Sequence, residues 1–467
     1  PYPKSTQTSF AEPAKEVATG SKTHVLVFPF QAQGHMNPMI QFSKRLASKG
    51  LKVTLVVTKK SLQSQDSSIK VEHIADFLED GNQMIDSVES FVERFRVAVS
   101  RGLPELIEKQ NSLGCPVKVV VYDASMPWVL DIAHQLGLYG AVFSTQSCAV
   151  GAVYYHMHKG SLKNIGPVEG STVSLPSMPL METKDLSSFI YDMGSYPSML
   201  RLVVNQFSNW EKADWRLFNT FDKLEGEVVN WMASQWPVKT VGPTIPSMYL
   251  DKRLEDDKDY ALSLFEPGDE DCIKWLNTKD AGSVVYVSFG SLANLGEDQM
   301  EELACGLKQS NRYFLWVVRA SEESKLPTNF STEASENGLL VNWCPQLKVL
   351  AHPAMGCFMT HCGWNSILEA LSLGVPMLAV PQWTDQPTNA KYVVDIWQAG
   401  VRVKVDEKGM IRREEIETCI REVMEGERGN ELKRNAVRWK ELAKAAVDEG
   451  GSSDKHIDEF ISELACN

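Results

Sequence analysis

The sequence predicts an α/β protein with two doubly wound domains, each a parallel sheet covered by helices. A chain of 467 residues is too long for one core of ordinary size. From Thr23 onward, short apolar runs alternate with helical patterns, which is the order of βαβ units. The alternation is interrupted by a segment rich in proline and charge, and then begins again. Two domains joined by one linker follow from these observations.

The domain boundaries are predicted from these changes in composition. Residues 1–22 are polar and contain no apolar segment, so we expect a flexible tail and no signal peptide. The first domain is predicted over 23–243, the linker over 244–271 and the second domain over 272–440. A last helical stretch, 441–467, is expected to pack back on the first domain.

The first domain opens with a predicted βαβ unit. The run Thr23–Phe30 (THVLVFPF) suits a strand buried on both faces, and Leu51–Thr58 supplies the next strand. Between them we expect a helix with Asn37 as N-cap, Pro38 as its first residue and Gly50 as its stop. Further strands are expected at 118–123 and 140–144, with a helix at 128–136.

The second domain repeats the pattern. Apolar runs predict strands at 283–289, 313–319, 338–343, 356–361 and 375–380. The stretch 412–465 is charged and helical, and the charged run LEDDKD at 254–259 is interpreted as solvated linker.

Charge and cysteine content exclude several classes of protein. The chain carries 60 acidic and 47 basic residues, a net charge of −13, and has no basic stripe, which argues against a nucleic-acid partner. No apolar run approaches the roughly 20 residues of a membrane span. Nine cysteines are scattered without C-x-x-C pairs, as in a reduced protein. We therefore expect a cytoplasmic protein, monomeric by default.

One strand end in the second domain predicts an anion site. The strand at 356–361 runs through Gly363 into a helix that begins with Trp364, Asn365 and Ser366. Free backbone N–H groups and the helix dipole at such a start attract anions. Glu369, one turn further on, could accept hydrogen bonds from ribose hydroxyls. The alternative is that Asn365 and Ser366 only cap the helix.

A longer match surrounds this site. From WCPQ at Trp343 to Asp385-Gln386, with HPAMGCFMTHCGWNSILEALSLGVPMLAVPQWTDQ between, the sequence resembles the plant secondary-product signature of family 1 UDP-dependent glycosyltransferases. The resemblance covers nearly the whole chain from Thr23 and looks closest to the branch that glucosylates small acids, phenolics and terpenoids. It implies the GT-B fold, two Rossmann-like domains facing a cleft, with the acceptor on the first domain and the UDP-sugar on the second.

The resemblance also implies roles for single residues. Trp343 is expected to stack on uracil, with Gln346 close to the nucleoside and Glu369 on the ribose hydroxyls. The residues implied for the diphosphate are Ser291, His361, Asn365 and Ser366. Those implied for the sugar are Trp364, Asp385, Gln386 and, at its 6-hydroxyl, Thr145. The closing Gln386 is the variant associated with glucose.

A predicted catalytic pair lies in the first domain. In QAQGHMNP, His35 stands beside a helix start, whose positive end should keep the imidazole neutral and able to take a proton. Asp123 ends a parallel strand, so its carboxylate can reach the same crevice and fix the tautomer. In the resembling family this pair is the catalytic dyad of an inverting transfer. No D-x-D pair is present at an expected metal position, so we expect no metal and no cofactor beyond the donor UDP-glucose.

Two other functions are weighed against this one. A catalytically silent sugar-nucleotide-binding protein is expected to lack His35 or Asp123, and both are present. A dinucleotide-dependent oxidoreductase is less expected, because the first βα turn has one glycine and no G-x-G-x-x-G. His156 and His158 are interpreted as helix residues and not as a metal pair. The acceptor is expected to be lipophilic, a phenolic, terpenoid or aromatic acid, with attack by hydroxyl or carboxyl left open.

Overall fold

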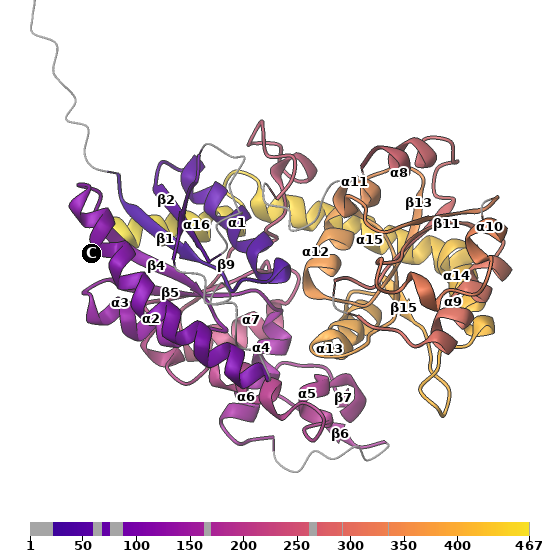
Figure 1. The fold of residues 1–467 in the computed structure, drawn as a ribbon, viewed down its shortest axis with the longest axis horizontal. Coiled ribbons are helices and arrows are strands. Elements are labelled where there is room, and N and C mark those ends of the chain that lie inside the picture. The colour runs from indigo at the N-terminus through magenta and orange to yellow at the C-terminus, as the bar shows by residue number, and fades with distance from the viewer. Residues whose placement is uncertain are drawn as a thin grey trace, which may run out of the picture.

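The computed structural model describes residues 22–58, 68–74, 87–162, 170–260, 269–291, 293–334 and 336–466. The expected tail therefore lies outside the described residues except for Lys22. Within them the chain forms two parallel sheets with helices on both faces, which confirms the predicted α/β class (Figure 1). None of the described helices combines the length and apolar character needed to cross a bilayer.

The first sheet has seven strands in the order β3-β2-β1-β4-β5-β8-β9. Their bounds are β1 His24–Phe28, β2 Lys52–Val57, β3 Lys70–His73, β4 Val117–Asp123, β5 Tyr139–Ser144, β8 Trp215–Phe218 and β9 Val238–Thr240. The associated helices are α1 Gln33–Ser48, α2 Val88–Ser112, α3 Trp128–Gln135, α4 Cys148–His158, α5 Ser188–Tyr191, α6 Pro197–Asn205 and α7 Gly226–Gln235. The ribbon β6 Thr172–Val173 and β7 Met181–Glu182 and the short helices η1 Thr183–Asp185 and η2 Trp210–Lys212 complete this half.

The second sheet has six strands in the order β12-β11-β10-β13-β14-β15. Their bounds are β10 Val284–Ser288, β11 Tyr313–Val317, β12 Gly338–Val341, β13 Met355–Thr360, β14 Met377–Ala379 and β15 Gly400–Arg402. The helical elements are η3 Ser247–Tyr249, α8 Asp269–Leu276, α9 Glu297–Gln309, η4 Glu323–Lys325, α10 Phe330–Glu333, α11 Gln346–Leu350, α12 Trp364–Leu373, α13 Gln386–Lys391, the π-helix η5 Tyr392–Ile396, α14 Arg413–Met424, α15 Gly426–Val447 and α16 Ser452–Cys466.

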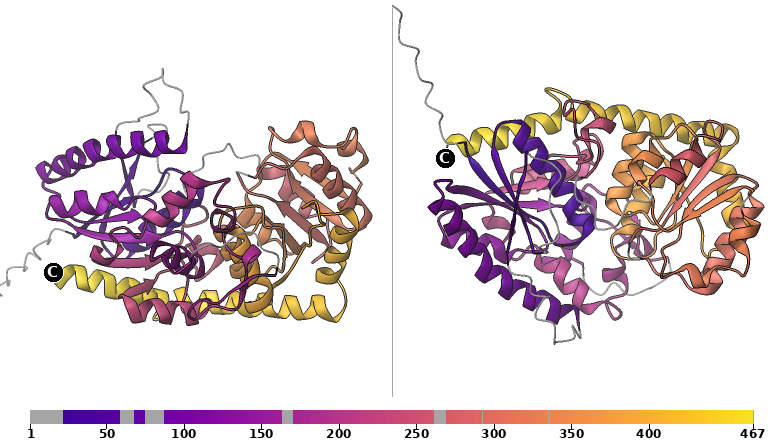
Figure 2. Two further views of the ribbon diagram at one scale, coloured as in Figure 1. Left: turned by 90° about the horizontal axis from the view of Figure 1, so that it is seen from below. Right: turned by 45° about the horizontal axis from the view of Figure 1, so that its top comes forward.

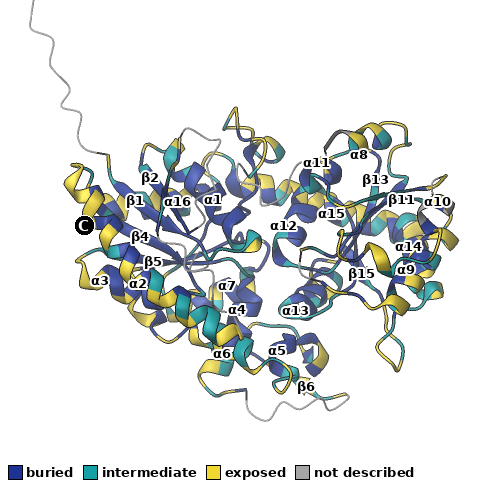
Figure 3. Ribbon diagram, viewed as in Figure 1, coloured by how far each residue is buried: buried dark blue, intermediate teal, exposed yellow. Residues whose placement is uncertain are grey.

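Burial on both faces explains the apolar strand sequences. Along β1, Val25 and Val27 pack into a core with α1 and α16, whereas Leu26 and Phe28 pack into the core on the opposite face. Successive side chains of a strand point to opposite faces, so a strand covered on both sides must be apolar throughout. Figure 3 shows this as buried strands inside helices whose outer faces are exposed.

The C-terminal helices connect the two domains. Helix α15 packs on α12 in the second domain, and α16 returns to the first sheet beside β9. There the ring of Phe460 lies 5.2 Å from that of Trp215 and 6.3 Å from that of Phe42, measured between centroids. Figure 2 shows these helices, in yellow, running along both domains.

The start of α1 differs from the prediction. The helix begins at Gln33 with Ala32 as its N-cap, so Asn37 is not the cap and Pro38 lies inside the helix. Ala32 has no capping side chain and therefore gives no local signal of a helix start. A proline at this position has no N–H to donate to the carbonyl four residues earlier, which belongs to Gly34.

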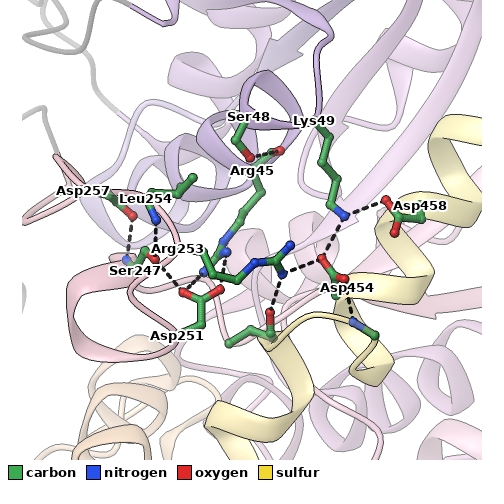
Figure 4. Close-up of polar contacts among 12 residues, drawn as sticks. Arg45, Ser48, Lys49, Ser247, Asp251, Arg253, Leu254, Asp257, Asp454 and Asp458 are labelled. Carbon is green, nitrogen blue, oxygen red and sulfur yellow. Dashed lines mark hydrogen bonds and ion pairs between the residues drawn. The ribbon is translucent and has the colours of Figure 1, made fainter.

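The linker is also bound more tightly than predicted. Asp257, within the run interpreted as solvated, is buried and accepts a hydrogen bond of 2.7 Å from Lys44 of α1. Asp251 pairs with Arg45, one residue further along the same helix, at 2.5 Å (Figure 4). A buried carboxylate needs such a partner because desolvation alone would destabilise its charge. Two ion pairs thus bind the part of the linker before residue 261 to α1.

Candidate active site

The predicted catalytic pair is assembled by neighbouring strands. Strands β1 and β4 are parallel partners, and His35 follows β1 in the first turn of α1 while Asp123 is the last residue of β4. The imidazole Nδ1 lies 2.8 Å from Asp123 Oδ2, and Oδ1 of the same carboxylate accepts 2.8 Å from the N–H of Ser125. The carboxylate is buried, whereas the imidazole is about one-third exposed, at 32%. The open side of the ring therefore faces away from Asp123.

Two further side chains fix the imidazole of His35. Thr145 Oγ1, just after β5, lies 3.1 Å from Nδ1, and the Phe30 ring packs edge-on with its centroid 5.3 Å away. Thr145 is thus in contact with the imidazole itself. Because Nδ1 is occupied by Asp123 and Thr145, Nε2 is the ring nitrogen left to exchange a proton with a ligand.

The pKa of His35 is shifted in the direction opposite to the one expected from the helix start. Burial acts to lower the pKa of His35, but the charge and hydrogen bond of Asp123, aided by the charge of Asp385, outweigh it and raise the pKa above its ordinary value. The helix start was expected to favour the neutral imidazole, whereas the raised pKa of His35 favours the protonated form. Asp123 therefore makes His35 a stronger base than an ordinary histidine.

The predicted anion site lies at the start of α12. Gly363 is the N-cap of α12 and no side chain caps the helix, so Asn365 and Ser366 do not act as caps. Burial lowers the pKa of His361 to about 4, so its imidazole is neutral at neutral pH. The imidazole of His361 fits here because its two neighbours, Gly290 and Gly363, have no side chain. A Cβ on Gly290 would lie 2.8 Å from the ring, and a Cβ on Gly363 would lie 2.5 Å from it.

A hydrogen bond between the domains joins the anion site to the catalytic pair. Asn365 Nδ2 donates to the carbonyl oxygen of Gly34 at 2.8 Å. Gly34 is the residue before His35, and its carbonyl is available because Pro38 cannot donate to it within the helix. The two halves of the predicted site, more than 300 residues apart in sequence, therefore lie against each other.

The residues implied for the ribose form a buried network. Glu369 is 4% exposed; its Oε2 accepts 2.7 Å from Gln346 Nε2, which also bonds Ser366 Oγ at 3.1 Å. Its Oε1 accepts 2.7 Å from the hydroxyl of Tyr260, a residue of the linker. Burial raises the pKa of Glu369, while the bonds from Gln346 and Tyr260 counteract this effect.

The residues implied for the sugar differ in how they are oriented. Asp385 Oδ2 accepts 2.7 Å from Asn389, whose Oδ1 in turn accepts from Ser147 of the first domain at 3.1 Å. Gln386 Oε1 accepts from the backbone N–H groups of residues 382 and 383. Trp364 is 4% exposed, and its indole N–H donates to the Asn219 carbonyl at 2.7 Å.

The two remaining predicted residues are more open. Trp343 is half-buried after β12, and Ser291 is exposed in the loop after β10, where its carbonyl accepts 2.6 Å from Arg319. Both follow strands of the second sheet, at the edge where His361 and Asn365 also lie. His156 and His158, by contrast, lie on α4, and His156 stacks on Trp231 with centroids 5.0 Å apart.

Comparison with known proteins decides the family. A family model described as "UDP-glucoronosyl and UDP-glucosyl transferase" matches residues 223–446, and one for the N-terminal domain of glycosyltransferases matches residues 21–73. UDP-glycosyltransferase 74E2 of Arabidopsis thaliana is 52% identical over 446 residues, which is 94% of this chain and 98% of the relative. The chain belongs to the plant family 1 UDP-dependent glycosyltransferases.

Other relatives and solved structures agree with this assignment. Mogroside I-E synthase of Siraitia grosvenorii is 52% identical over 95% of this glycosyltransferase and 98% of its own length. The crystal structure of Os79 from O. sativa in complex with UDP is 38% identical, with a TM-score of 0.88 over 94% of this chain and all of that one. Phytolacca americana UGT2, complexed with UDP-2-fluoro-glucose and pterostilbene, gives 0.82 at 26% identity over 95% of this chain and all of that one. The predicted GT-B fold is confirmed.

Sequence reasoning missed two residues of the glycosyltransferase's site. Asn389 lies four residues after Asp385, and this helical spacing places both on one face of the chain, which was a usable signal. Tyr260 gave no signal, since its partner Glu369 is 109 residues away and the linker has no periodic pattern.

Proposed function

We propose that this glycosyltransferase transfers glucose from UDP-glucose to a hydroxyl or carboxyl group of a small lipophilic acceptor, with inversion at the anomeric carbon. The observation that carries the proposal is the hydrogen bond from Asn365 to Gly34. This bond supports the proposal because it joins the residue before His35 to the start of α12, where the sugar diphosphate is proposed to bind. The oxygen of the acceptor, the anomeric carbon of the sugar and the leaving diphosphate can then lie in line.

The proposed chemistry is a single displacement. His35 Nε2 takes the proton of the acceptor hydroxyl while the oxygen forms a bond to the anomeric carbon from the face opposite UDP. The bond from that carbon to the phosphate oxygen breaks, and its electron pair leaves with UDP. Asp123, 2.8 Å from Nδ1, stabilises the imidazolium that forms. A carboxylate acceptor is already ionised and needs no base.

Negative charge grows on the leaving diphosphate. We propose that the backbone N–H groups at the start of α12, with His361, Asn365, Ser366 and Ser291, stabilise it without a metal. The neutral imidazole of His361 suits this role as a hydrogen-bond donor. Trp343 is proposed to stack on uracil, and Asp385 and Gln386 to bind the glucose hydroxyls.

The acceptor proposal rests on the apolar surroundings of His35. Phe30 contacts the imidazole, and Phe91 and Phe95 pack on Phe30 with centroids 6.3 Å and 5.6 Å away. Such rings favour an acceptor with an apolar body and one reactive oxygen. Nine free cysteines fit a reducing compartment, so we further propose a cytoplasmic enzyme, and a monomer.

An acceptor screen tests the proposal. The purified protein is incubated with UDP-glucose and a panel of phenolics, terpenoid alcohols and aromatic acids, beside UDP-galactose and UDP-glucuronate. We expect a product heavier by one hexose, with a β-anomeric proton coupling, formed fastest from UDP-glucose. A faster reaction with another donor would contradict the glucose assignment, and an α-linked product would contradict the displacement.

A further inference from the structure

Linker residues 257–260 contact both α1, the helix that carries His35, and Glu369, the residue implied for the ribose hydroxyls. Lys44 Nζ of α1 donates to Asp257 Oδ1 at 2.7 Å and to the carbonyl of Asp259 at 2.8 Å. Gln41 Nε2, one turn earlier on the same helix, donates to that carbonyl at 3.0 Å. Two donors from α1 thus fix the peptide unit just before Tyr260.

This segment is also anchored from its other side. Asp257 Oδ2 accepts from the N–H of Ser247 at 2.6 Å, which closes the linker into a compact loop. Arg253, within the loop, pairs with Asp454 of α16 at 3.0 Å (Figure 4). Charged groups that are buried and paired on several sides hold one geometry, since each alternative would leave a charge unpartnered.

Tyr260 extends from this anchored segment to the second domain. Its hydroxyl donates to Glu369 Oε1 at 2.7 Å, while Gln346 donates to Oε2 at 2.7 Å. Burial and the charge of Glu369 raise the pKa of Tyr260, so the hydroxyl keeps its proton and remains a donor.

The Glu369 carboxylate can accept more hydrogen bonds than these two. A carboxylate has about four lone-pair positions, two on each oxygen. Among the described residues, Tyr260 occupies one position on Oε1 of Glu369 and Gln346 one on Oε2, which leaves one position on each oxygen. Two neighbouring hydroxyls, such as the 2′- and 3′-hydroxyls of a ribose, match this pattern.

We propose that Tyr260 is a positioning residue for the nucleotide's ribose, which orients the Glu369 carboxylate from the α1-anchored linker so that both ribose hydroxyls are bound. The inference deepens the proposed function and rests on the UDP-sugar binding there. It adds a residue of the linker between the domains to a proposed nucleotide site whose other residues lie in the second domain.

The test compares two nucleotides on the full-length protein by titration calorimetry: UDP and 2′-deoxy-UDP, with the wild type, Tyr260→Phe and Tyr249→Phe. Tyr249 lies in the same linker, and its hydroxyl makes no hydrogen bond to Glu369 among the described residues, so Tyr249→Phe is the matched control. We expect the wild type and Tyr249→Phe to prefer UDP clearly. In Tyr260→Phe we expect UDP affinity to fall about tenfold, 2′-deoxy-UDP affinity to change much less, and the preference to shrink accordingly.

This ratio is internal to each variant, so a change in folding stability does not alter it. In turnover, the KM for UDP-glucose should rise in Tyr260→Phe while kcat stays near that of the wild type. An unchanged ratio, or an equal loss for both nucleotides, would overturn the inference. Failure of the wild type to bind UDP would instead overturn the proposed function, so the two failures are distinguishable.

Discussion

The substitution Asp123→Asn should lower the rate for hydroxyl acceptors and move its pH dependence to lower pH. The carboxylate is buried and lies 2.8 Å from His35 Nδ1. At an effective dielectric constant of about 20, unit charges at that distance interact by roughly 6 kcal/mol. If about half of this is realised when the proton is half transferred, roughly 3 kcal/mol of barrier lowering is lost, or about a hundredfold in rate.

The sign of the pH shift follows from the causes of the raised pKa. His35 must be neutral to act as base, so wild-type activity should rise with pH through a pKa above the ordinary 6.5. Without the Asp123 carboxylate, burial still lowers that pKa and only the charge of Asp385 raises it. The acid limb of the profile should therefore move to lower pH while the plateau falls.

The assay is kcat/KM from pH 5 to 9 with one phenol and one aromatic acid as acceptors. The acid, already ionised, should lose less than about tenfold. Asp214→Asn is the matched control, because it disrupts a second His–Asp pair, with His134 at 3.0 Å on the surface. An unmoved acid limb, or equal losses with phenol and acid, would refute the reasoning.

Three further predictions concern the contact between domains, the linker and metals. Asn365→Ala removes the bond to Gly34 and one proposed diphosphate donor, so kcat/KM for UDP-glucose should fall on the order of 10²-fold in steady-state assays; a loss below about threefold would contradict its role. Arg45→Met removes the ion-pair partner of the buried Asp251 carboxylate and should lower the free energy of unfolding by about 3–5 kcal/mol in urea titrations, with recovery in Arg45→Met/Asp251→Leu. Burial acts to raise the pKa of Asp251, but the hydrogen bonds and charge of Arg45 outweigh it and lower that pKa. The contribution of the ion pair to stability should therefore be complete above about pH 4 and lost as pH falls further. No loss of this contribution on acidification would count against the prediction. EDTA should leave turnover unchanged, and restoration of a lost activity by magnesium or manganese would disprove metal independence.

The sequence predicted the parts of the fold that rest on local patterning. Apolar runs gave β1, β4 and β10 within two residues of their bounds, because strands buried on both faces are apolar throughout. Strand β8 was not foreseen, since Trp215–Phe218 includes a buried arginine, Arg216, whose guanidinium bonds the Trp210 carbonyl at 2.8 Å. Such compensation depends on tertiary contacts and leaves no periodic signal.

The candidate site likewise contains residues that sequence motifs predict and residues whose contacts only the folded chain shows. His35, Asp123 and the residues around Asn365 stand in motifs, and their strand-end positions explain why they meet. The burial of Asp257 and the hydrogen bond to the Gly34 carbonyl depend on partners far away in sequence, Lys44 and Asn365 respectively. The contact of Tyr260 with Glu369 depends on how the linker is fastened to α1, which is a property of the folded chain alone.

The central claim is that a base at His35 faces a nucleotide held at the start of α12. Its most direct test is to measure, for His35→Ala, both turnover with a hydroxyl acceptor and the Kd for UDP. The account predicts a turnover lower by about 10²–10⁴ with a Kd for UDP close to that of the wild type. Near-normal turnover in a folded variant that still binds UDP would contradict it.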